Sequence, residues 1–389
     1  MKLLSVLSLA VALTAGSYAQ AQPTVKIGLV APFSGPFAVY GQQFQRGAEL
    51  ALQEAGGKAG NAKIELVTRD ENGGPEKAKQ VTQELIVQDQ VKLLMGYQLT
   101  PDAAAVATLV TQSKTPTIIL NAATGVLTRR SPYFVRFSFT EWQTASTIAN
   151  WGAKNGIKSV YSAIADYAPG HDSRDAFKHF FTKAGGTIAG EVLMPVSTSD
   201  FAPYLQKIKD AKPDAVYLFM PVGPPAVAFI KTYYQLGLPE AGIKLLATGQ
   251  TDELDLPAIG DQAIGLVTAY FYSPYTDNAA NKKFVAAYKK KYGENLLPNF
   301  AAAIAYDGMQ AALSALGKVG ETADGTQMMD FLKHWKAQSP RGAIAIDPVE
   351  RDIVQPIAVR RVQRVGNVLG NIPFETIPDV KDGWKELNK

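Results

Sequence analysis

Two short polar segments are the best candidates for chemistry in this sequence. The first reads Gly-Tyr-Gln-Leu-Thr over residues 96–100, and the second reads Asn-Ala-Ala-Thr over residues 121–124. Each follows an apolar run that is typical of a buried strand. In open α/β sheets, ligands bind beyond the carboxyl ends of the strands, where backbone N–H groups and helix starts favour negative charge. The two segments can therefore direct N–H groups and hydroxyls at a single anion.

A hydrolytic site is the competing chemistry. Asp166, His171 and Asp172 are close in sequence and would form a catalytic cluster if a serine joined them in space. A solvated loop or the start of a helix explains the same three residues. The chain has no G-x-S-x-G nucleophile elbow, no phosphate-binding P-loop and no strand-linked G-x-G-x-x-G. We therefore expect a binding protein and not an enzyme.

The composition excludes further classes of site. The 389 residues include no cysteine and only three histidines, His171, His179 and His334. The lack of cysteine excludes disulfides, thiolate zinc sites, thiol catalysis and a lipidated N-terminal cysteine. We expect no metal site and no cofactor. Lysine and arginine number 39 against 35 acidic residues, and this mixed net charge of +4 is too weak to indicate a nucleic-acid partner.

Strand-like and helix-like runs alternate along most of the chain, and 47% of the residues are hydrophobic, enough for a sizeable core. Strands separated by helices imply parallel sheets with right-handed crossovers. So many units do not fit one open sheet, so we predict two α/β lobes, with a closed eight-fold barrel as the alternative. The expected strands cover residues 25–31, 63–69, 91–96, 117–120, 159–165, 215–220, 244–247 and 264–271, and the expected helices include 42–55, 76–88, an alanine-rich helix that Thr100 can cap, 201–211 and 279–292.

The first 21 residues have the pattern of a secretory signal peptide. Lys2 precedes an apolar run over residues 3–15, and residues 19–21 read Ala-Gln-Ala, a small-x-small cleavage element. The alternative is a membrane anchor, but the run is shorter than the roughly 20 residues that a span needs. We therefore expect an exported, soluble protein. The bacterial periplasm is its natural location, because no cysteine is present for lipidation.

The start of the mature chain resembles a known family. Residues 31–41 read Ala-Pro-Phe-Ser-Gly-Pro-Phe-Ala-Val-Tyr-Gly and are similar to the opening of the type I periplasmic solute-binding proteins of branched-chain amino acid transporters. The similarity covers nearly all of the mature chain, and the order and spacing of its motifs make it specific. Further matching motifs lie at residues 96–100, 120–124, 133–136, 166–170 and 305–307.

This resemblance implies a fold and a role. The fold consists of two doubly wound parallel-sheet lobes, joined by three crossing segments near residues 137–141, 269–272 and 339–347. A small solute is held in the cleft and delivered to the membrane permease and ATPase of an ABC importer, and we expect the binding protein to be a monomer. The implied division is a signal peptide at 1–21, lobe 1 at 22–138 plus 272–340, lobe 2 at 139–271 plus 341–372, and a C-terminal surface tail at 373–389.

The resemblance also assigns residues to the cleft. By matching, the ligand carboxylate would be held by the two polar segments, and second-lobe segments at 167–169 and 220–222 would form a wall. A plain helix cap for Thr100, a turn hydroxyl for Thr124 and a half-buried surface aromatic for Tyr40 are the alternatives. The full predicted set is Tyr40, Tyr97, Leu99, Thr100, Ala122, Ala123, Thr124, Tyr167, Ala168, Pro169, Met220, Pro221, Gln250, Thr251 and Phe271.

Position 250 departs from the amino-acid binders of the family. Those proteins place an acidic residue on the second lobe to hold the ammonium group, whereas this chain carries the neutral Gln250. Burying an ammonium beside a neutral amide would be costly. Asp252 could substitute or could only cap the following turn. Glu141 matches another acidic position, but it begins a helix and could be a surface residue.

Aromatic residues gather in or near the cleft segments, although some of them belong to the core. Segments 121–124, 136–140, 166–172 and 339–342 resemble a subgroup that binds aromatic carboxylates. The resemblance therefore implies uptake of a benzoate-like, phenylpropenoid or aromatic 2-oxo acid. The alternatives are a branched-chain or other amino-acid binder and a protein that presents its ligand to a sensory receptor. The aromatic residues concerned are Phe37, Tyr40, Tyr97, Trp142, Tyr167, Phe219, Phe271 and Tyr272.

Overall fold

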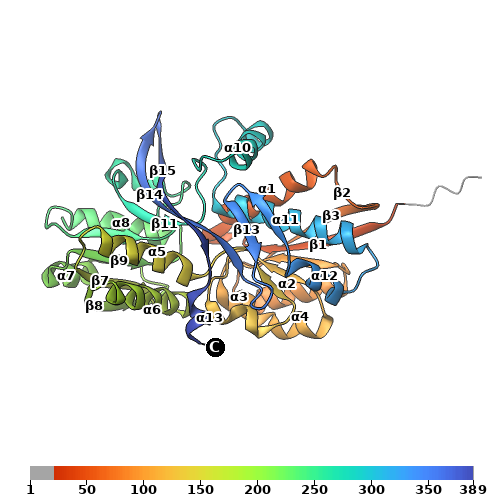
Figure 1. The fold of residues 1–389 in the computed structure, drawn as a ribbon, viewed down its shortest axis with the longest axis horizontal. Helices are drawn as coiled ribbons and strands as arrows, with labels where there is room; N and C mark the ends of the chain where they lie inside the picture. Colours follow the sequence, from red (N-terminus) through yellow and green to blue (C-terminus); the bar gives the residue numbers. More distant parts are fainter. Residues whose placement is uncertain (1–21, 389) are drawn as a thin grey trace, which may run out of the picture.

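The computed structural model describes residues 22–388, which form an elongated molecule with two α/β lobes (Figure 1). The predicted signal peptide at residues 1–21 lies outside the described residues. Each lobe is built on one open sheet, so the closed barrel is ruled out. The predicted fold class, two doubly wound lobes with parallel sheets, is confirmed.

The first sheet has six strands in the order β2-β3-β1-β4-β5-β6. All neighbours pair in parallel except the short β2, which forms an antiparallel hairpin with β3. The strands are β1 (Thr24–Ala31), β2 (Lys58–Ala59), β3 (Ala62–Asp70), β4 (Leu93–Gly96), β5 (Thr117–Ile119) and β6 (Phe134–Arg136). The helices of this lobe are η1 (Gly35–Phe37), α1 (Ala38–Glu54), α2 (Pro75–Val87), α3 (Thr100–Ala105), α4 (Ala107–Ser113), η2 (Gly125–Arg130), α10 (Ala279–Tyr292), α11 (Phe300–Val319) and α12 (Gly325–Leu332).

Both faces of this sheet are apolar, as expected for parallel strands that helices cover on both sides. Leu93 and Met95 of β4 pack in the cluster that includes residues of α1 and α11, whereas Leu94 packs with residues of α2 to α4. Helices α1 and α11 approach closely because position 47 is a glycine. A Cβ atom there would lie 2.0 Å from the backbone oxygen of Ala302.

The second sheet has nine strands, with parallel strands in the order β11-β10-β9-β7-β8 and the antiparallel strands β12 to β15 at the β11 end. The strands are β7 (Ser159–Ala165), β8 (Thr187–Met194), β9 (Ala215–Phe219), β10 (Lys244–Ala247), β11 (Val267–Tyr270), β12 (Lys336–Ser339), β13 (Gly342–Ile346), β14 (Ile353–Val365) and β15 (Val368–Val380). The helices of this lobe are α5 (Glu141–Lys154), α6 (Ala168–Lys183), α7 (Ala202–Ala211), α8 (Pro224–Gln235), α9 (Leu256–Ile259), η3 (Asp261–Ala263) and α13 (Gly383–Leu387).

One apolar cluster runs through both lobes. It contains Ile27 and Met95 of the first sheet, Ile164 and Tyr217 of the second sheet, and Phe137 of the segment that joins them. The segment between the lobes is therefore part of the core, which fixes where the ends of the two sheets face each other.

The chain passes between the lobes three times. It leaves the first lobe through residues 137–140 and returns through 271–278, both close to the predicted positions. After α12 the chain forms the hairpin of β12 and β13, which pairs with β14. Ser339 still bonds Asp307 of α11, and Arg351 still bonds Phe134 of β6. The third crossing at 339–347 therefore stays a prediction.

The prediction of an irregular surface tail from residue 373 is also wrong. Strand β15 pairs with β14 along most of its length, and α13 contacts η2, α5 and α6. The side chains of β15 are mostly exposed or half-buried, and for this reason its polar sequence resembles that of an unstructured surface tail. An antiparallel strand can expose its side chains while its backbone pairs with a neighbour. The remaining lobe boundaries stay a prediction.

Several predicted elements have the bounds that the structure gives them, including β7, β10 and α10. The alanine-rich helix is instead divided at Val106 into α3 and α4, and its N-cap is Leu99 rather than Thr100. Across residues 22–388, no helix combines the length and the apolar character that a membrane crossing requires.

Candidate functional site

A cavity lies between the lobes, where the loops after β4 and β5 of the first sheet face the loops after β7, β9 and β10 of the second. Its volume is about 40 Å³. That is well below the roughly 150 Å³ of a cavity known to accept benzene, so the cleft must widen to admit an aromatic solute. The lining residues are Gln98, Leu99, Thr100, Asn121, Ala122, Ala123, Phe139, Glu141, Tyr167, Pro169, Phe219, Met220, Pro221, Val222, Thr248, Gly249, Gln250 and Tyr270.

The two polar segments expected to hold an anion form one wall of this cavity. They are adjacent because β4 and β5 are neighbours in the sheet. Asn121 Nδ2 donates a hydrogen bond of 2.7 Å to the Gln98 carbonyl oxygen, and the Ala122 N–H donates one of 3.2 Å to the Tyr97 carbonyl oxygen. Each loop therefore holds the other in place.

The first loop turns sharply as it leaves β4. Gly96 has φ +137°, and a Cβ atom there would lie 1.8 Å from the carbonyl oxygen of Val30, so no other residue fits. Tyr97 follows with φ +70°. Its side chain packs in the core beside α2, with its hydroxyl 2.9 Å from that of Thr82. Tyr97, a predicted ligand contact, is therefore turned away from the cavity.

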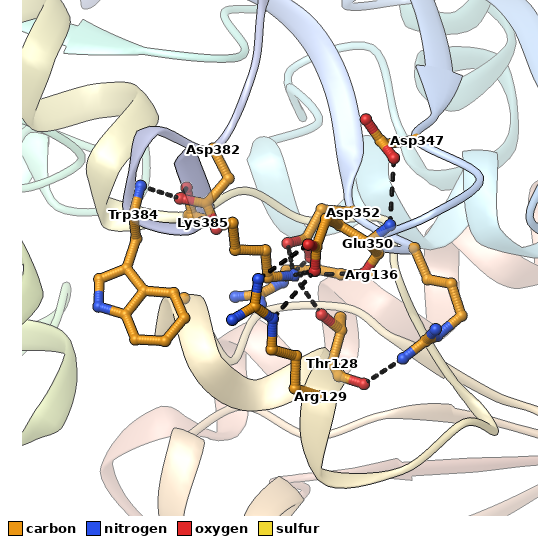
Figure 2. Close-up of polar contacts among 12 residues, drawn as sticks. Thr128, Arg129, Arg136, Asp347, Glu350, Asp352, Asp382, Trp384 and Lys385 are labelled. Carbon is orange, nitrogen blue, oxygen red and sulfur yellow. Dashed lines mark hydrogen bonds and ion pairs between the residues drawn. The ribbon is translucent and has the colours of Figure 1, made fainter. Parts of the chain in front are cut away.

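Arg136 of β6 supports the second loop, and Figure 2 shows its side chain beside Asp352 and Lys385. Its Nη1 donates hydrogen bonds to the carbonyl oxygens of Thr124 (2.9 Å) and Ala122 (3.3 Å). Its Nε donates to Asp352 Oδ1 at 2.8 Å, and the Lys385 ammonium of α13 binds the other oxygen of that carboxylate. The guanidinium thus holds the loop's carbonyl groups, and with the Ala122 N–H bonded to Tyr97, the Ala123 N–H is the loop donor best placed to meet an anion.

Thr100 lines the cavity, whereas Thr124 does not. The Thr124 hydroxyl donates a hydrogen bond of 3.3 Å to the Thr100 hydroxyl oxygen. This arrangement corrects the expected role of Thr124, which supports Thr100 and contributes no direct wall of the cavity. Thr100 is the first residue of α3, and N–H groups in a first helical turn have no acceptor within the helix.

Aromatic rings form the opposite wall. Tyr167, at the N-cap of α6, stacks on Phe219 with ring centroids 6.2 Å apart. Phe139 of the first crossing lies edge-on to Tyr270 of β11, with centroids 5.2 Å apart. Together with Pro169, Met220 and Pro221, which also line the cavity, these rings offer a surface against which a flat apolar group can pack.

Four other predicted residues lie outside the lining. The Tyr40 hydroxyl donates a hydrogen bond of 3.0 Å to Asp255, and Phe271 stacks behind Phe139 with centroids 5.1 Å apart. The Thr251 hydroxyl donates to Asn371 at 2.7 Å, and Ala168 is the first residue of α6.

The segment around position 250 contains no free carboxylate for an ammonium. Gln250 lines the cavity, but its Oε1 accepts a hydrogen bond of 2.8 Å from the Thr248 N–H, and its Nε2 donates one of 2.8 Å to the Met220 carbonyl. Asp252 lies outside the lining and accepts hydrogen bonds from the Leu254 N–H and from Asn299. Both polar side chains are therefore occupied by the protein itself.

Glu141 is the acidic residue that does reach the cavity. It is 2% exposed and begins α5, directly after the N-cap Thr140. Burial raises the pKa of its carboxyl well above the usual range, and the nearby Asp172 adds to the effect. The alternative of a surface residue at this position is wrong, because the start of α5 meets the first lobe, where the Glu141 N–H donates to the Ala123 carbonyl.

Sequence reasoning missed several lining residues. Gln98 and Asn121 sit inside the segments singled out for an anion, and Thr248 and Gly249 directly precede Gln250, so proximity in sequence was the available signal. Phe139 and Tyr270 lie in the predicted crossing segments, which places them near the cleft. Only the folded chain shows which aromatic rings face the cavity. The missed residues are Gln98, Asn121, Phe139, Thr248, Gly249 and Tyr270.

The alternative hydrolytic cluster is not assembled. His171 Nε2 on α6 and Asp166 Oδ1 in the segment after β7 are 2.8 Å apart at the solvent-exposed surface, outside the cavity lining. Asp172 instead accepts a hydrogen bond of 2.7 Å from the Gly125 N–H and so links the two lobes. Within residues 22–388, no group of three or more His, Asp or Glu side chains is placed to hold a metal ion.

Residues 24–367 match a family model described as periplasmic binding protein. A curated relative in Brucella melitensis, named Leu/Ile/Val-binding protein homolog 6, is 40% identical over 366 residues, which covers 94% of each chain.

Solved structures of similar proteins carry aromatic acids. A solute-binding protein of an ABC transporter from Rhodopseudomonas palustris, in complex with 3,4-dihydroxybenzoic acid, is 44% identical, covers 93% of this chain and 99% of its own, and superposes with a TM-score of 0.89. A second solute-binding protein from R. palustris, in complex with 4-hydroxybenzoate, is 38% identical, covers 94% of this chain and 100% of its own, and has a TM-score of 0.91.

Proposed function

Because this chain belongs to the periplasmic binding protein family, we propose that it is the solute-binding component of an ABC importer and captures a small aromatic carboxylate between its lobes. The observation that carries the proposal is the make-up of the cavity. One wall consists of two loops that can offer N–H groups to an anion, and the other consists of Phe139, Tyr167, Phe219 and Tyr270. The relatives that bind dihydroxybenzoic and hydroxybenzoic acids support it as well.

Binding would divide the ligand between the two walls. The carboxylate would accept hydrogen bonds from the backbone around Leu99–Thr100 and Ala122–Ala123, and the Thr100 hydroxyl would add a further donor. A hydrogen bond to a charged group contributes roughly 1.5–3 kcal/mol, more than one between neutral groups. The ring would pack on the aromatic wall. Neither lobe can make both sets of contacts alone, so the ligand favours the closed arrangement.

An amino-acid ligand is the second candidate, and one observation favours it. Glu141 is a carboxylate in the cavity that could hold an ammonium, and the Brucella relative is named for leucine, isoleucine and valine. Against it, Gln250 replaces the acid that amino-acid binders carry on the second lobe, and both of its polar atoms are engaged by the protein.

The cellular role follows the same proposal. The chain would be exported through the signal peptide at residues 1–21, act as a monomer in the periplasm, and hand its ligand to a permease and ATPase without chemical change. The division into lobe 1 (22–138 plus 272–340) and lobe 2 (139–271 plus 341–372) belongs to this proposal. Intact mass of the periplasmic form tests export. A mass that includes residues 1–15 would contradict it.

A thermal-shift panel tests the ligand class. Benzoate, 4-hydroxybenzoate, a phenylpropenoid acid, leucine and valine would each be added at the same excess. A ligand present at 100 times its Kd stabilises the folded protein by about 2.7 kcal/mol. We expect a rise in melting temperature with the aromatic acids and none with the amino acids. The reverse pattern would establish the second candidate.

A further inference from the structure

Of the described residues that line the cavity, Glu141 is the only acidic one and none is basic. In the binding mode proposed above, no group of the aromatic acid contacts this carboxyl group. The hydrogen bond that the carboxyl group accepts from the Thr144 hydroxyl is long, at 3.5 Å, so the carboxyl group keeps bonding capacity for a ligand group in the cavity.

We infer that Glu141 determines specificity by hydrogen bonding, as a neutral acid, to a hydroxyl group on the ring of the bound aromatic acid. This inference rests on the proposed function and narrows its ligand class to hydroxylated aromatic acids. It assigns the ring hydroxyl to a single residue of this chain.

The surroundings of Glu141 favour the neutral form. The Thr144 hydroxyl on α5 lies 3.5 Å from Oε2, and Asp172 on α6 contributes a second acid. The nearest cation, Arg136 on β6, is already paired with Asp352 at 2.8 Å. An ionised Glu141 would also repel the ligand carboxylate across a cavity of low dielectric. A neutral carboxylic acid has one donor and one acceptor, which matches a phenolic hydroxyl.

The neighbours of Glu141 place this contact between the two walls. The Glu141 N–H donates to the Ala123 carbonyl at 3.3 Å, so its backbone adjoins the carboxylate wall. Its side chain lines the same cavity as the rings of Tyr167 and Tyr270. A ring that packs on the aromatic wall would therefore bring a hydroxyl group within reach of Glu141.

The experiment compares 4-hydroxybenzoate with benzoate by calorimetry in the wild type, Glu141→Gln and Glu141→Leu. One hydrogen bond between neutral groups corresponds to about a 2- to 12-fold difference in Kd. We expect this preference for 4-hydroxybenzoate in the wild type and in Glu141→Gln, whose amide also has a donor and an acceptor. It should vanish in Glu141→Leu, while the affinity for benzoate is kept. Glu253→Gln, which alters a half-buried acid outside the lining, should leave both affinities unchanged.

The possible failures are distinguishable. An unchanged preference in Glu141→Leu, or an equal loss of affinity for both acids, overturns this inference and leaves the proposed function standing. Loss of the preference in Glu141→Gln overturns the neutral-acid form of the contact. Wild-type protein that binds leucine and neither aromatic acid overturns the proposed function and this inference with it.

Discussion

The phenol of Tyr40 on α1 donates a hydrogen bond of 3.0 Å to the carboxylate of Asp255, which precedes α9 in the other lobe. The same carboxylate oxygen accepts a hydrogen bond of 2.9 Å from the Gly223 N–H. The bond joins the lobes beside the cavity, so it exists only when they are closed. Tyr40, expected from the sequence to touch ligand, instead stabilises the closed state.

The first prediction concerns this contact. Tyr40→Phe removes one hydrogen bond from the closed state and none from the open state, so ligand affinity should fall by about 2- to 12-fold. Calorimetry measures the affinity, and small-angle scattering of the ligand-free variant should give a larger radius of gyration than the wild type. Tyr133→Phe, whose hydroxyl contacts Thr326 within the first lobe, is the control. Identical affinity and scattering in Tyr40→Phe would contradict the assignment.

The second prediction separates Thr100 from Thr124. Thr100→Val removes a hydroxyl on the cavity wall and should weaken binding of a carboxylate by about 10- to 150-fold, the equivalent of one hydrogen bond to a charged group. Thr124→Ala removes only the support behind it and should have a smaller effect. Titration of both variants with the same aromatic acid tests this order. A larger loss in Thr124→Ala would show that Thr124 is the direct anchor.

The sequence located the cavity but not the orientation of its side chains. The anion loops could be found because they follow β4 and β5, and parallel neighbouring strands must end at the same edge of the sheet. Tyr97 could not be placed, because its φ of +70° turns the ring into the core, and that conformation depends on Gly96 packing against Val30. The role of Thr124 could not be predicted either. Its hydrogen bond to Thr100 depends on the loop conformation, which Arg136 holds through the Thr124 carbonyl.

The C-terminal region was unpredictable for a different physical reason. Strand β15 is held by backbone hydrogen bonds to β14, and a polar stretch carries no local sign of such a partner. The burial of Lys385 depends on Asp352, and together they connect the last helix with Arg136 behind the anion loop (Figure 2). Such a network becomes visible only once distant segments have met.

The third prediction tests that network. Lys385→Met removes a buried ammonium and leaves Asp352 with Arg136 alone. Breaking a buried ion pair costs about 3–5 kcal/mol, and the remaining partner should keep the loss near the lower end. Denaturant unfolding of the variant measures it. Lys381→Met, in an exposed pair with Asp347, should change stability by less than about 1 kcal/mol. Equal, small losses in the two variants would mean that Lys385 contributes no more than a surface pair.

The fourth prediction concerns pH. Burial raises the pKa of Asp102, Asp172, Asp255 and Asp382 to about 6. The unfolded chain titrates these groups near 3.9. Between these values the folded protein binds more protons than the unfolded chain, so its stability rises as pH falls from 7 toward 5.

Groups with a lowered pKa act in the opposite direction but at lower pH. Asp347 and Glu350 are stabilised as anions by hydrogen bonds and by Lys381, Lys385 and Arg129, and their contribution is lost only as pH falls below about 4.5. Melting temperatures at constant ionic strength should therefore be higher at pH 5.5 than at pH 7.5. A melting temperature that is lower at pH 5.5 than at pH 7.5 would mean that the four aspartates stay ionised in the folded protein.

The central claim is that the cleft binds an aromatic carboxylate and not an amino acid. Isothermal titration of the mature protein with 4-hydroxybenzoate and, separately, with leucine tests it most directly. The account predicts saturable one-to-one binding of 4-hydroxybenzoate that Thr100→Val weakens by at least about 10-fold, and no heat of binding with leucine. Tight binding of leucine with no response to 4-hydroxybenzoate would contradict the account.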